Sequence, residues 1–231
     1  MKTIGLIGGM SWESTLLYYR LINETVRQTL GGLHSAKLVL HSVDFADIEP
    51  LQRAGDWQQA GHRMADAARS LEAAGADCVV LCTNTMHKVA HAMEAASPLP
   101  LLHIADATGQ AVVQAGLHTV GLLGTRFTME QDFYSDRLRA LHGLKVLTPE
   151  EAGRAQVHRI IYEELCQGQV LSASRQIYQR VMAELVAQGA QAIVLGCTEI
   201  TLLVGEADAS VPLFDTTALH AKQAACWAMK H

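Results

Sequence analysis

Short apolar runs alternate along the chain with longer segments of helical period. In the first long segment Leu17 and Leu21, followed by Ile22, Val26 and Leu30, keep a four-residue spacing that indicates one buried helix stripe. This alternation is typical of βα units and parallel sheets. The short runs predict strands at residues 3–7, 38–41, 78–82, 101–104, 119–123, 192–195 and 212–214, with helices in the intervals.

The two halves of the chain repeat one another. Residues 5–9 read GLIGG and are echoed by GLLGT at 121–125, while GADCVVLCT at 75–83 is echoed by GAQAIVLGC at 189–197. The paired segments begin 70 positions apart in the first half (5 to 75) and 68 apart in the second (121 to 189). Chance similarity between βα units is the alternative, since buried parallel strands share composition. We predict an α/β fold of two pseudo-symmetric domains, residues 1–100 with 215–231 and residues 101–214, each a mainly parallel sheet flanked by helices.

The repeat places Thr83 and Cys197 at equivalent positions, just after equivalent strands. Open α/β sheets bind their ligands at the carboxyl ends of strands, so both side chains are expected to face a ligand in a cleft between the domains. Side chains alternate along a strand, and Cys82 should therefore point to the opposite face. Cys82 is predicted to belong to the core.

Small and hydroxyl-bearing residues fill the turns after the strands, at 8–11, 83–85, 124–125 and 197–198. Each turn is expected to lead into a helix, whose exposed backbone N–H groups could bind a carboxylate. Ordinary helix capping by Ser, Thr and Asn is the alternative for any single turn.

Composition narrows the possible partners and cofactors. The formal charge is −5, aromatic residues make up 5%, and the five cysteines show no CxxC spacing, so neither a nucleic-acid surface nor a metal site is expected. The glycines lack the G-x-G-x-x-G spacing, no Walker lysine is present, and none of the six lysines is marked as a pyridoxal phosphate ligand. Without a membrane-spanning run or targeting segment, we expect a cytoplasmic protein that needs no cofactor and binds a small molecule, neither a membrane nor a nucleic acid.

Three motifs together resemble the aspartate/glutamate racemase family. They are Gly8-Gly9-Met10, residues 84–87 (NTMH) and residues 196–199 (GCTE), and the resemblance covers nearly the whole chain. It implies a homodimeric amino-acid racemase that works without pyridoxal phosphate. It also implies two cysteines on either side of an interdomain cleft, one removing the α-proton and the other returning a proton to the opposite face.

The chain departs from this pattern at Thr83, which stands where the family has its first cysteine. A thiol can reach the anionic state near neutral pH, whereas an aliphatic hydroxyl cannot, so Thr83 is a poor base that can still donate or relay a proton. The resemblance implies that Cys197 is the base toward the L-enantiomer. Saturated turnover is then expected to be low overall or slower from the D-enantiomer. A helix cap in an inactive descendant is the alternative reading of Thr83.

The resemblance implies acidic substrates, aspartate or glutamate, or a broader set that includes neutral amino acids such as homoserine. His87 and Glu199 are candidates for orienting the catalytic pair, and Arg53 and Arg126 for holding an acidic side chain. Two alternatives stay open: a related thiol isomerase of the hydantoin racemase or maleate isomerase type, and a non-catalytic amino-acid-binding protein. The substrate-binding candidates are Met10, Ser11, Gln52, Asn84, Thr85, Thr125, Thr198 and Glu199.

Overall fold

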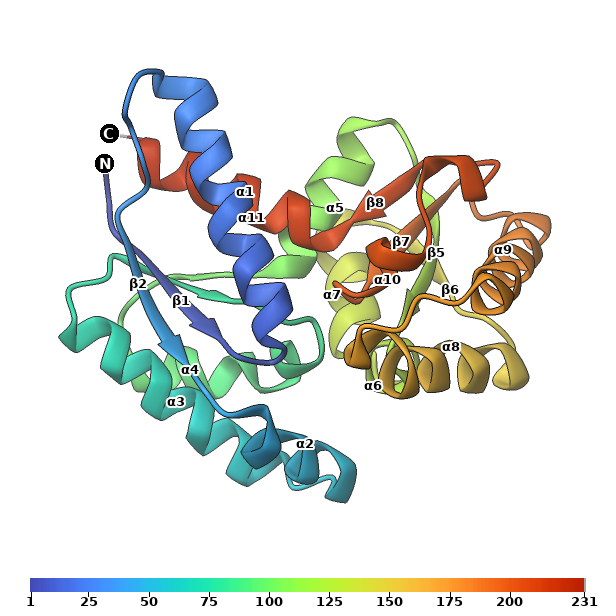
Figure 1. Cartoon of the computed structure of the whole chain (residues 1–231), viewed down its shortest axis with the longest axis horizontal. Coiled ribbons are helices and arrows are strands. Elements are labelled where there is room, and N and C mark those ends of the chain that lie inside the picture. Colours follow the sequence, from blue (N-terminus) through green and yellow to red (C-terminus); the bar gives the residue numbers. More distant parts are fainter. Residues whose placement is uncertain (231) are drawn as a thin grey trace. The chain divides into compact units, whose positions relative to one another are not determined.

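The computed structural model describes residues 1–230, which form two compact units. Unit 1 comprises residues 1–104 with the segment from His220 onward, and unit 2 comprises residues 105–219. Each unit holds a parallel four-stranded sheet with helices packed against it, which confirms the predicted α/β class (Figure 1). No helix within residues 1–230 is long and apolar enough to cross a membrane.

Unit 1 is built on a sheet with the strand order β2-β1-β3-β4. Its helices alternate with the strands along the chain, and the segment that returns from unit 2 adds a further helix. The strands are β1 (Ile4–Gly8), β2 (Leu38–Ser42), β3 (Cys78–Leu81) and β4 (Leu101–Leu102). The helices are α1 (Trp12–Leu30), α2 (Phe45–Ala54), α3 (Trp57–Ala73), the 3-10 helix η1 (Thr85–Val89), α4 (Ala90–Ala96) and α11 (Thr216–Met229).

The pleat of β3 divides the core of unit 1 into two layers. Cys78 and Val80 pack with residues of α1 and α11, while Val79 and Leu81 pack with residues of α3 and α4. Cys82, just after the strand, continues the first layer and is fully buried, as the alternation predicted. Figure 1 shows α1 and α3 on opposite sides of the sheet.

Unit 2 repeats this topology with the strand order β6-β5-β7-β8. Residues of β5 and β7 pack in one buried cluster with residues of two long helices, α8 and α9. The strands are β5 (Thr119–Gly124), β6 (Lys145–Leu147), β7 (Ala192–Gly196) and β8 (Leu213–Asp215). The helices are α5 (Ile104–Gln114), α6 (Arg126–Glu130), α7 (Asp132–His142), α8 (Glu151–Glu163), the 3-10 helix η2 (Leu165–Gln167), α9 (Ser172–Ala187), α10 (Ile200–Leu203) and the 3-10 helix η3 (Glu206–Asp208).

The strand registers support the repeat seen in the sequence. Ile7 of β1 pairs with Leu81 of β3, and Leu123 of β5 pairs with Leu195 of β7. Leu81 and Leu195 are therefore equivalent. Thr83 and Cys197 each lie two residues further on, at matching positions.

The predicted strands agree with the observed ones to within one residue at each end, with two exceptions. The predicted strand 101–104 is only Leu101–Leu102, because α5 already begins at Ile104. Strand β6 was absent from the prediction, since its three residues, of which Lys145 is exposed, carry too little apolar pattern to indicate an edge strand.

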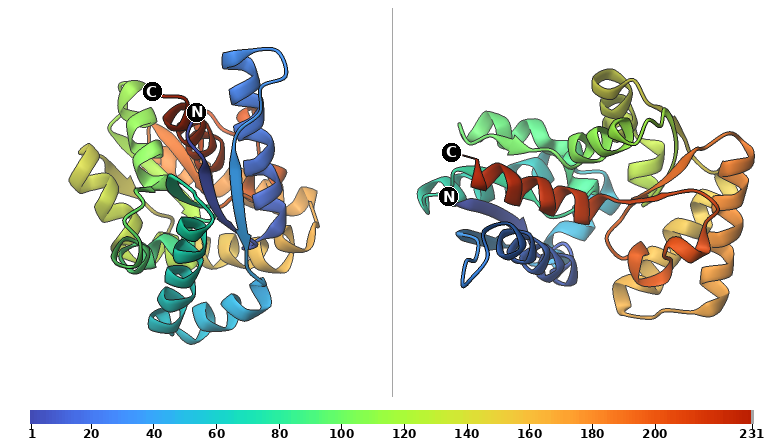
Figure 2. Two further views of the ribbon diagram at one scale, coloured as in Figure 1. Left: turned by 90° about the vertical axis from the view of Figure 1, so that its left-hand side faces the viewer. Right: turned by 90° about the horizontal axis from the view of Figure 1, so that it is seen from above.

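Both ends of the described chain lie in unit 1. The backbone N–H of Lys2 donates to the carbonyl of Ala228 (2.9 Å), and the Lys2 ammonium lies 4.3 Å from the ring centroid of Trp227. Figure 2 shows the N-terminus of the chain next to helix α11. Helix α11 therefore completes the core of unit 1 with Ala221, Ala224, Ala225 and Ala228.

Replacing Cys82 by Ala is expected to lower the free energy of unfolding by about 1 kcal/mol, because it removes a buried sulfur from a packed layer. Denaturant unfolding of the two proteins measures the difference. Cys226→Ala is the matched control, since this thiol on α11 is only partly buried and its loss should cost less. Equal stability of Cys82→Ala and the wild type would contradict the assignment of Cys82 to the core.

Candidate active site

The turn after β1 is held by a threonine that the motifs did not reveal. The Thr15 hydroxyl accepts a hydrogen bond from the Gly9 N–H (2.8 Å) and donates one to the Ser11 carbonyl (2.9 Å). A Cβ at Gly8 would lie 2.4 Å from a Thr15 methyl carbon, and one at Gly9, where φ is +92°, would lie 2.1 Å from the Val43 carbonyl oxygen. Both positions thus require glycine. The spacing of Ser11 and Thr15, one helical turn apart, is the signal that could have indicated this contact.

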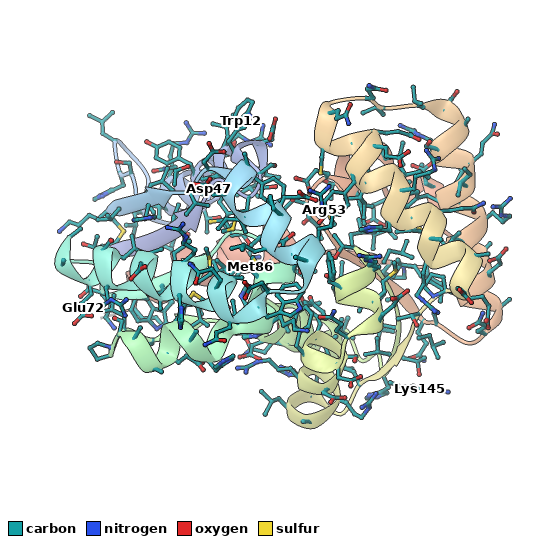
Figure 3. All side chains as sticks on the ribbon, turned by 90° about the horizontal axis from the view of Figure 1, so that it is seen from below. Trp12, Asp47, Arg53, Glu72, Met86 and Lys145 are labelled. Atoms are coloured by element: carbon teal, nitrogen blue, oxygen red, sulfur yellow. The ribbon has the colours of Figure 1, made fainter. Side chains whose placement is uncertain are left out.

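Ser11 caps α1 by accepting a hydrogen bond from the Ser14 N–H (3.4 Å). Met10 is buried against the core layer that contains Leu81 and Met86, the latter labelled in Figure 3. The turn therefore joins the sheet to the helix through one capped, closely packed segment, as the prediction of a helix after each strand required.

The turn after β3 carries three of the predicted residues. Thr83 is partly buried, and Asn84 and Thr85 are buried. The ring of His87 holds this turn, with its Nδ1 lying 2.7 Å from the Thr83 carbonyl oxygen. Because β1 and β3 are adjacent and parallel, their turns leave the same edge of the sheet. The structure thus gathers Met10, Ser11, Thr83, Asn84 and Thr85 at this edge of unit 1.

Helix α2 follows β2 and carries Gln52 and Arg53. Gln52 is buried, whereas the Arg53 side chain is 73% exposed and its guanidinium lies 3.8 Å from the Glu49 carboxylate. Figure 3 shows Arg53 near the end of α2. A weak, exposed ion pair of this kind leaves the Arg53 charge available to a ligand.

Two glycines bring the ends of β5 and β7 together in unit 2. Gly124 pairs with Gly196, and a Cβ added at either would lie 2.9 Å from a backbone oxygen of the neighbouring strand. Thr125 and Cys197 follow these glycines, so both residues leave the same edge of the sheet. The Thr125 hydroxyl caps α6 by accepting a hydrogen bond from the Thr128 N–H (3.4 Å).

Glu199 is the hydrogen-bonding centre of the turn after β7. Its Oε2 accepts from the Cys197 thiol (3.0 Å) and from the Thr198 hydroxyl (2.6 Å). Thr198 and Glu199 are buried, and Cys197 is partly buried. The prediction that Glu199 orients or tunes Cys197 therefore has a direct contact to support it.

The surroundings of Cys197 favour its protonated form. Burial raises the pKa of the Cys197 thiol well above its ordinary value, and the Glu199 charge, the Cys166 thiol and the hydrogen bond to Glu199 raise it further. The backbone N–H of Glu199 acts in the opposite direction. Cys197 therefore rests as a thiol beside a proton acceptor, and a thiolate forms only when the proton moves or the local charge changes.

A cationic and aromatic cluster adjoins Thr125. The Arg126 backbone N–H donates to Nδ1 of His158 (3.3 Å), and the Arg126 guanidinium carbon lies 5.0 Å from the Phe127 ring centroid. Burial and the Arg126 charge lower the pKa of His158. Arg126 directly follows Thr125, which leaves the same sheet edge as Cys197. Within residues 1–230 no group of three or more His, Cys, Asp or Glu side chains could hold a metal ion.

Comparison with known proteins gives matches over the whole length. A family model described as Asp/Glu/Hydantoin racemase matches residues 7–224. A broad-specificity amino-acid racemase of Bacillus subtilis is 24% identical over 221 residues, 95% of each chain. A solved structure named as a candidate Asp/Glu racemase, from Yersinia pestis, is 60% identical with a TM-score of 0.94 over 100% of both chains. An aspartate racemase homologue from Pyrococcus horikoshii is 32% identical with a TM-score of 0.86, also over 100% of both chains.

Replacing Glu199 by Gln is expected to lower the pKa of Cys197 relative to the wild type, because the Glu199 charge is removed while the Gln amide oxygen can still accept the thiol hydrogen bond. Burial remains, so the pKa should stay above that of a free thiol. The pH dependence of iodoacetamide alkylation, followed by mass spectrometry of the Cys197 peptide, measures the shift. Glu206→Gln in η3 is the matched control, and a pKa that is unchanged or higher in Glu199→Gln would contradict the electrostatic assignment.

Proposed function

Because the chain belongs to the Asp/Glu/hydantoin racemase family, we propose that it is an amino-acid racemase that works without pyridoxal phosphate. Its substrates are aspartate, glutamate or a broader set of amino acids that includes homoserine. The observation that carries the proposal is the Cys197 thiol, 3.0 Å from a buried carboxylate, at the strand end equivalent to that of Thr83.

In the proposed reaction Cys197 is the base toward the L-enantiomer. Glu199 accepts the thiol proton, and the thiolate then takes the α-proton of the bound amino acid. The Thr83 hydroxyl gives its proton to the opposite face of the carbanion and regains one from water or a neighbouring group, while Glu199 releases to solvent the proton that it took from Cys197. The α-carbon loses one proton and gains one, so its configuration inverts without an oxidation or reduction.

Backbone N–H groups and hydroxyls at the two sheet edges are proposed to bind the substrate carboxylate. In unit 1 the proposed binding residues are Met10, Ser11, Asn84 and Thr85. The Gln52 amide is proposed to contact the rest of the substrate. In unit 2 the proposed binding residues are Thr125 and Thr198. Ser11 and Thr125 already cap helices, so their hydroxyls would bind substrate in addition to that role.

Acidic substrates are supported by the names of the relatives and by the two arginines. The relatives from Yersinia pestis and Pyrococcus horikoshii are named for Asp/Glu or aspartate racemases, and the Bacillus subtilis relative is named for broad specificity. Arg53 and Arg126 are the cations proposed to hold a side-chain carboxylate. The expected homodimer and the cytoplasmic location stay predictions.

Loss of the α-proton signal in D₂O, followed by NMR, tests the function directly. L-aspartate, L-glutamate, L-homoserine and other neutral amino acids form the panel. A racemase exchanges the α-proton of at least one of them. A protein that binds an amino acid without exchange is a non-catalytic descendant, and activity only on a hydantoin or on maleate would assign the related isomerase reactions.

Cys197→Ala is expected to abolish α-proton exchange on every accepted substrate while leaving the fold intact, because the thiol is only partly buried. The loss should be at least about 10³-fold, as for removal of a nucleophile or base from other enzymes. Exchange rates at equal folded concentration measure it. Cys226→Ala, which removes a partly buried thiol on α11, should retain full activity. Near-wild-type exchange by Cys197→Ala would mean that Cys197 is not the base.

Thr83→Cys is expected to raise kcat most from the D-enantiomer, because a thiol at this position can become an anion where the hydroxyl cannot. The two enantiomers have equal free energy, so kcat/KM must rise by one common factor in both directions. Circular dichroism of each pure enantiomer gives kcat and KM for both proteins. Equal gains in the two kcat values would argue against Thr83 as the weak base. No gain in any parameter would mean that Thr83 takes no part in the proton transfer.

A further inference from the structure

Three buried histidines form a cluster in unit 1. His87 lies in η1, His103 precedes α5, and His220 lies in α11 at the point where the chain returns to unit 1. The ring centroid of His87 is 4.4 Å from that of His103 and 5.9 Å from that of His220. Three segments that are far apart in the sequence therefore meet next to the turn that carries Thr83.

The hydrogen bonds of His220 fix which of its ring nitrogens carries the hydrogen. Nε2 lies 2.6 Å from the carbonyl oxygen of Leu102, which can only accept, so Nε2 is the donor. Nδ1 lies 2.8 Å from the hydroxyl of Tyr18 and, in the neutral ring, accepts from it. His220 is therefore held as the Nε2–H tautomer.

His87 requires the opposite tautomer. The backbone N–H of Ile104 can only donate, and it points at Nε2 of His87 (3.3 Å), so Nε2 must present its lone pair. The hydrogen is then on Nδ1 and is donated to the Thr83 carbonyl oxygen (2.7 Å). A neutral imidazole supplies both a donor and an acceptor on one rigid ring, which neither Lys nor Arg can do.

His87 thereby connects Thr83 to the segment through which the chain leaves unit 1. Ile104 is the last residue of unit 1 before α5 continues in unit 2, and Leu102, two residues earlier, is held by His220. The turn that carries Thr83 is thus fixed to a segment that is itself hydrogen-bonded to α11.

We propose that His87 is a positioning residue for the proton transfer at Thr83, acting as the neutral Nδ1–H tautomer that bridges the Thr83 carbonyl and the Ile104 N–H. The inference rests on the proposed role of Thr83. His87 touches no reacting atom in this account. It sets the backbone of the turn, and with it the direction of the Thr83 hydroxyl.

Two substitutions separate the two hydrogen bonds of His87. Asn places an amide N–H near the position of Nδ1 and can still hold Thr83, whereas Gln reaches the position of Nε2 and can still accept from Ile104. His87→Asn should therefore retain most of the inversion activity. His87→Gln should lower it roughly five- to tenfold, as for the loss of one hydrogen bond that orients a reacting group.

The informative readout is the ratio of D-product formed to α-deuterium incorporated into recovered L-substrate in D₂O. Exchange into the L-enantiomer needs Cys197 alone, whereas inversion also needs Thr83. His87→Gln should shift this ratio toward that of Thr83→Ala, while a purely structural loss would lower both quantities together. His91→Gln, an exposed histidine one helical turn further on, is the matched control and should leave the ratio unchanged.

Ring ¹⁵N NMR of histidine-labelled protein tests the bridge without any substrate. The expected result is Nδ1–H for His87 and Nε2–H for His220, with the His87 signal lost in His87→Asn. An Nε2–H tautomer at His87, or equal loss of exchange and inversion in His87→Gln, would overturn the positioning role. A wild-type protein that exchanges no α-proton would instead overturn the proposed function, and the tautomer would still decide whether the bridge exists.

Discussion

The candidate site depends on the direct pairing of the first and third strands in each unit. β1 lies beside β3 and β5 beside β7, so the turns that follow them leave the same sheet edge. The close approach requires residues without a Cβ, as the contacts at Gly5, Gly124 and Gly196 demonstrate, because a Cβ at each would meet a backbone oxygen of the neighbouring strand. A side chain at any of these positions would displace the backbone that carries the reactive groups.

The chemistry proposed for Cys197 follows from how its proton is shared. Burial and the neighbouring Glu199 carboxylate both oppose a free thiolate and raise the pKa of Cys197. The Cys197 thiol therefore keeps its proton until a ligand alters the charge around it. Thr83 has no matching carboxylate partner in its own motif, because Thr85 stands where the second half has Glu199. The two halves are alike in backbone and different in acid–base chemistry.

Much of the fold could be predicted because the sequence carries two independent periodicities. The period of two along β3 placed Cys82 in the core, and the spacing of the repeat placed Thr83 and Cys197 at equivalent positions in their own units. The strand β6 could not be predicted, since three residues at a sheet edge carry little pattern. The histidine cluster was also beyond reach, because its members come from separate segments, and only tertiary packing brings their rings together.

The route of the chain through unit 1 has a consequence for synthesis on the ribosome. Unit 2 is continuous in sequence, whereas one core layer of unit 1 needs four alanines of α11 that are made after unit 2. Domains tend to fold as they emerge from the ribosome, N-terminal parts first. Here part of the apolar surface of unit 1 stays uncovered until α11 has been made. The second unit can therefore finish folding before the first, and a chain cut short after residue 219 would expose the apolar side of β1 and β3 to aggregation.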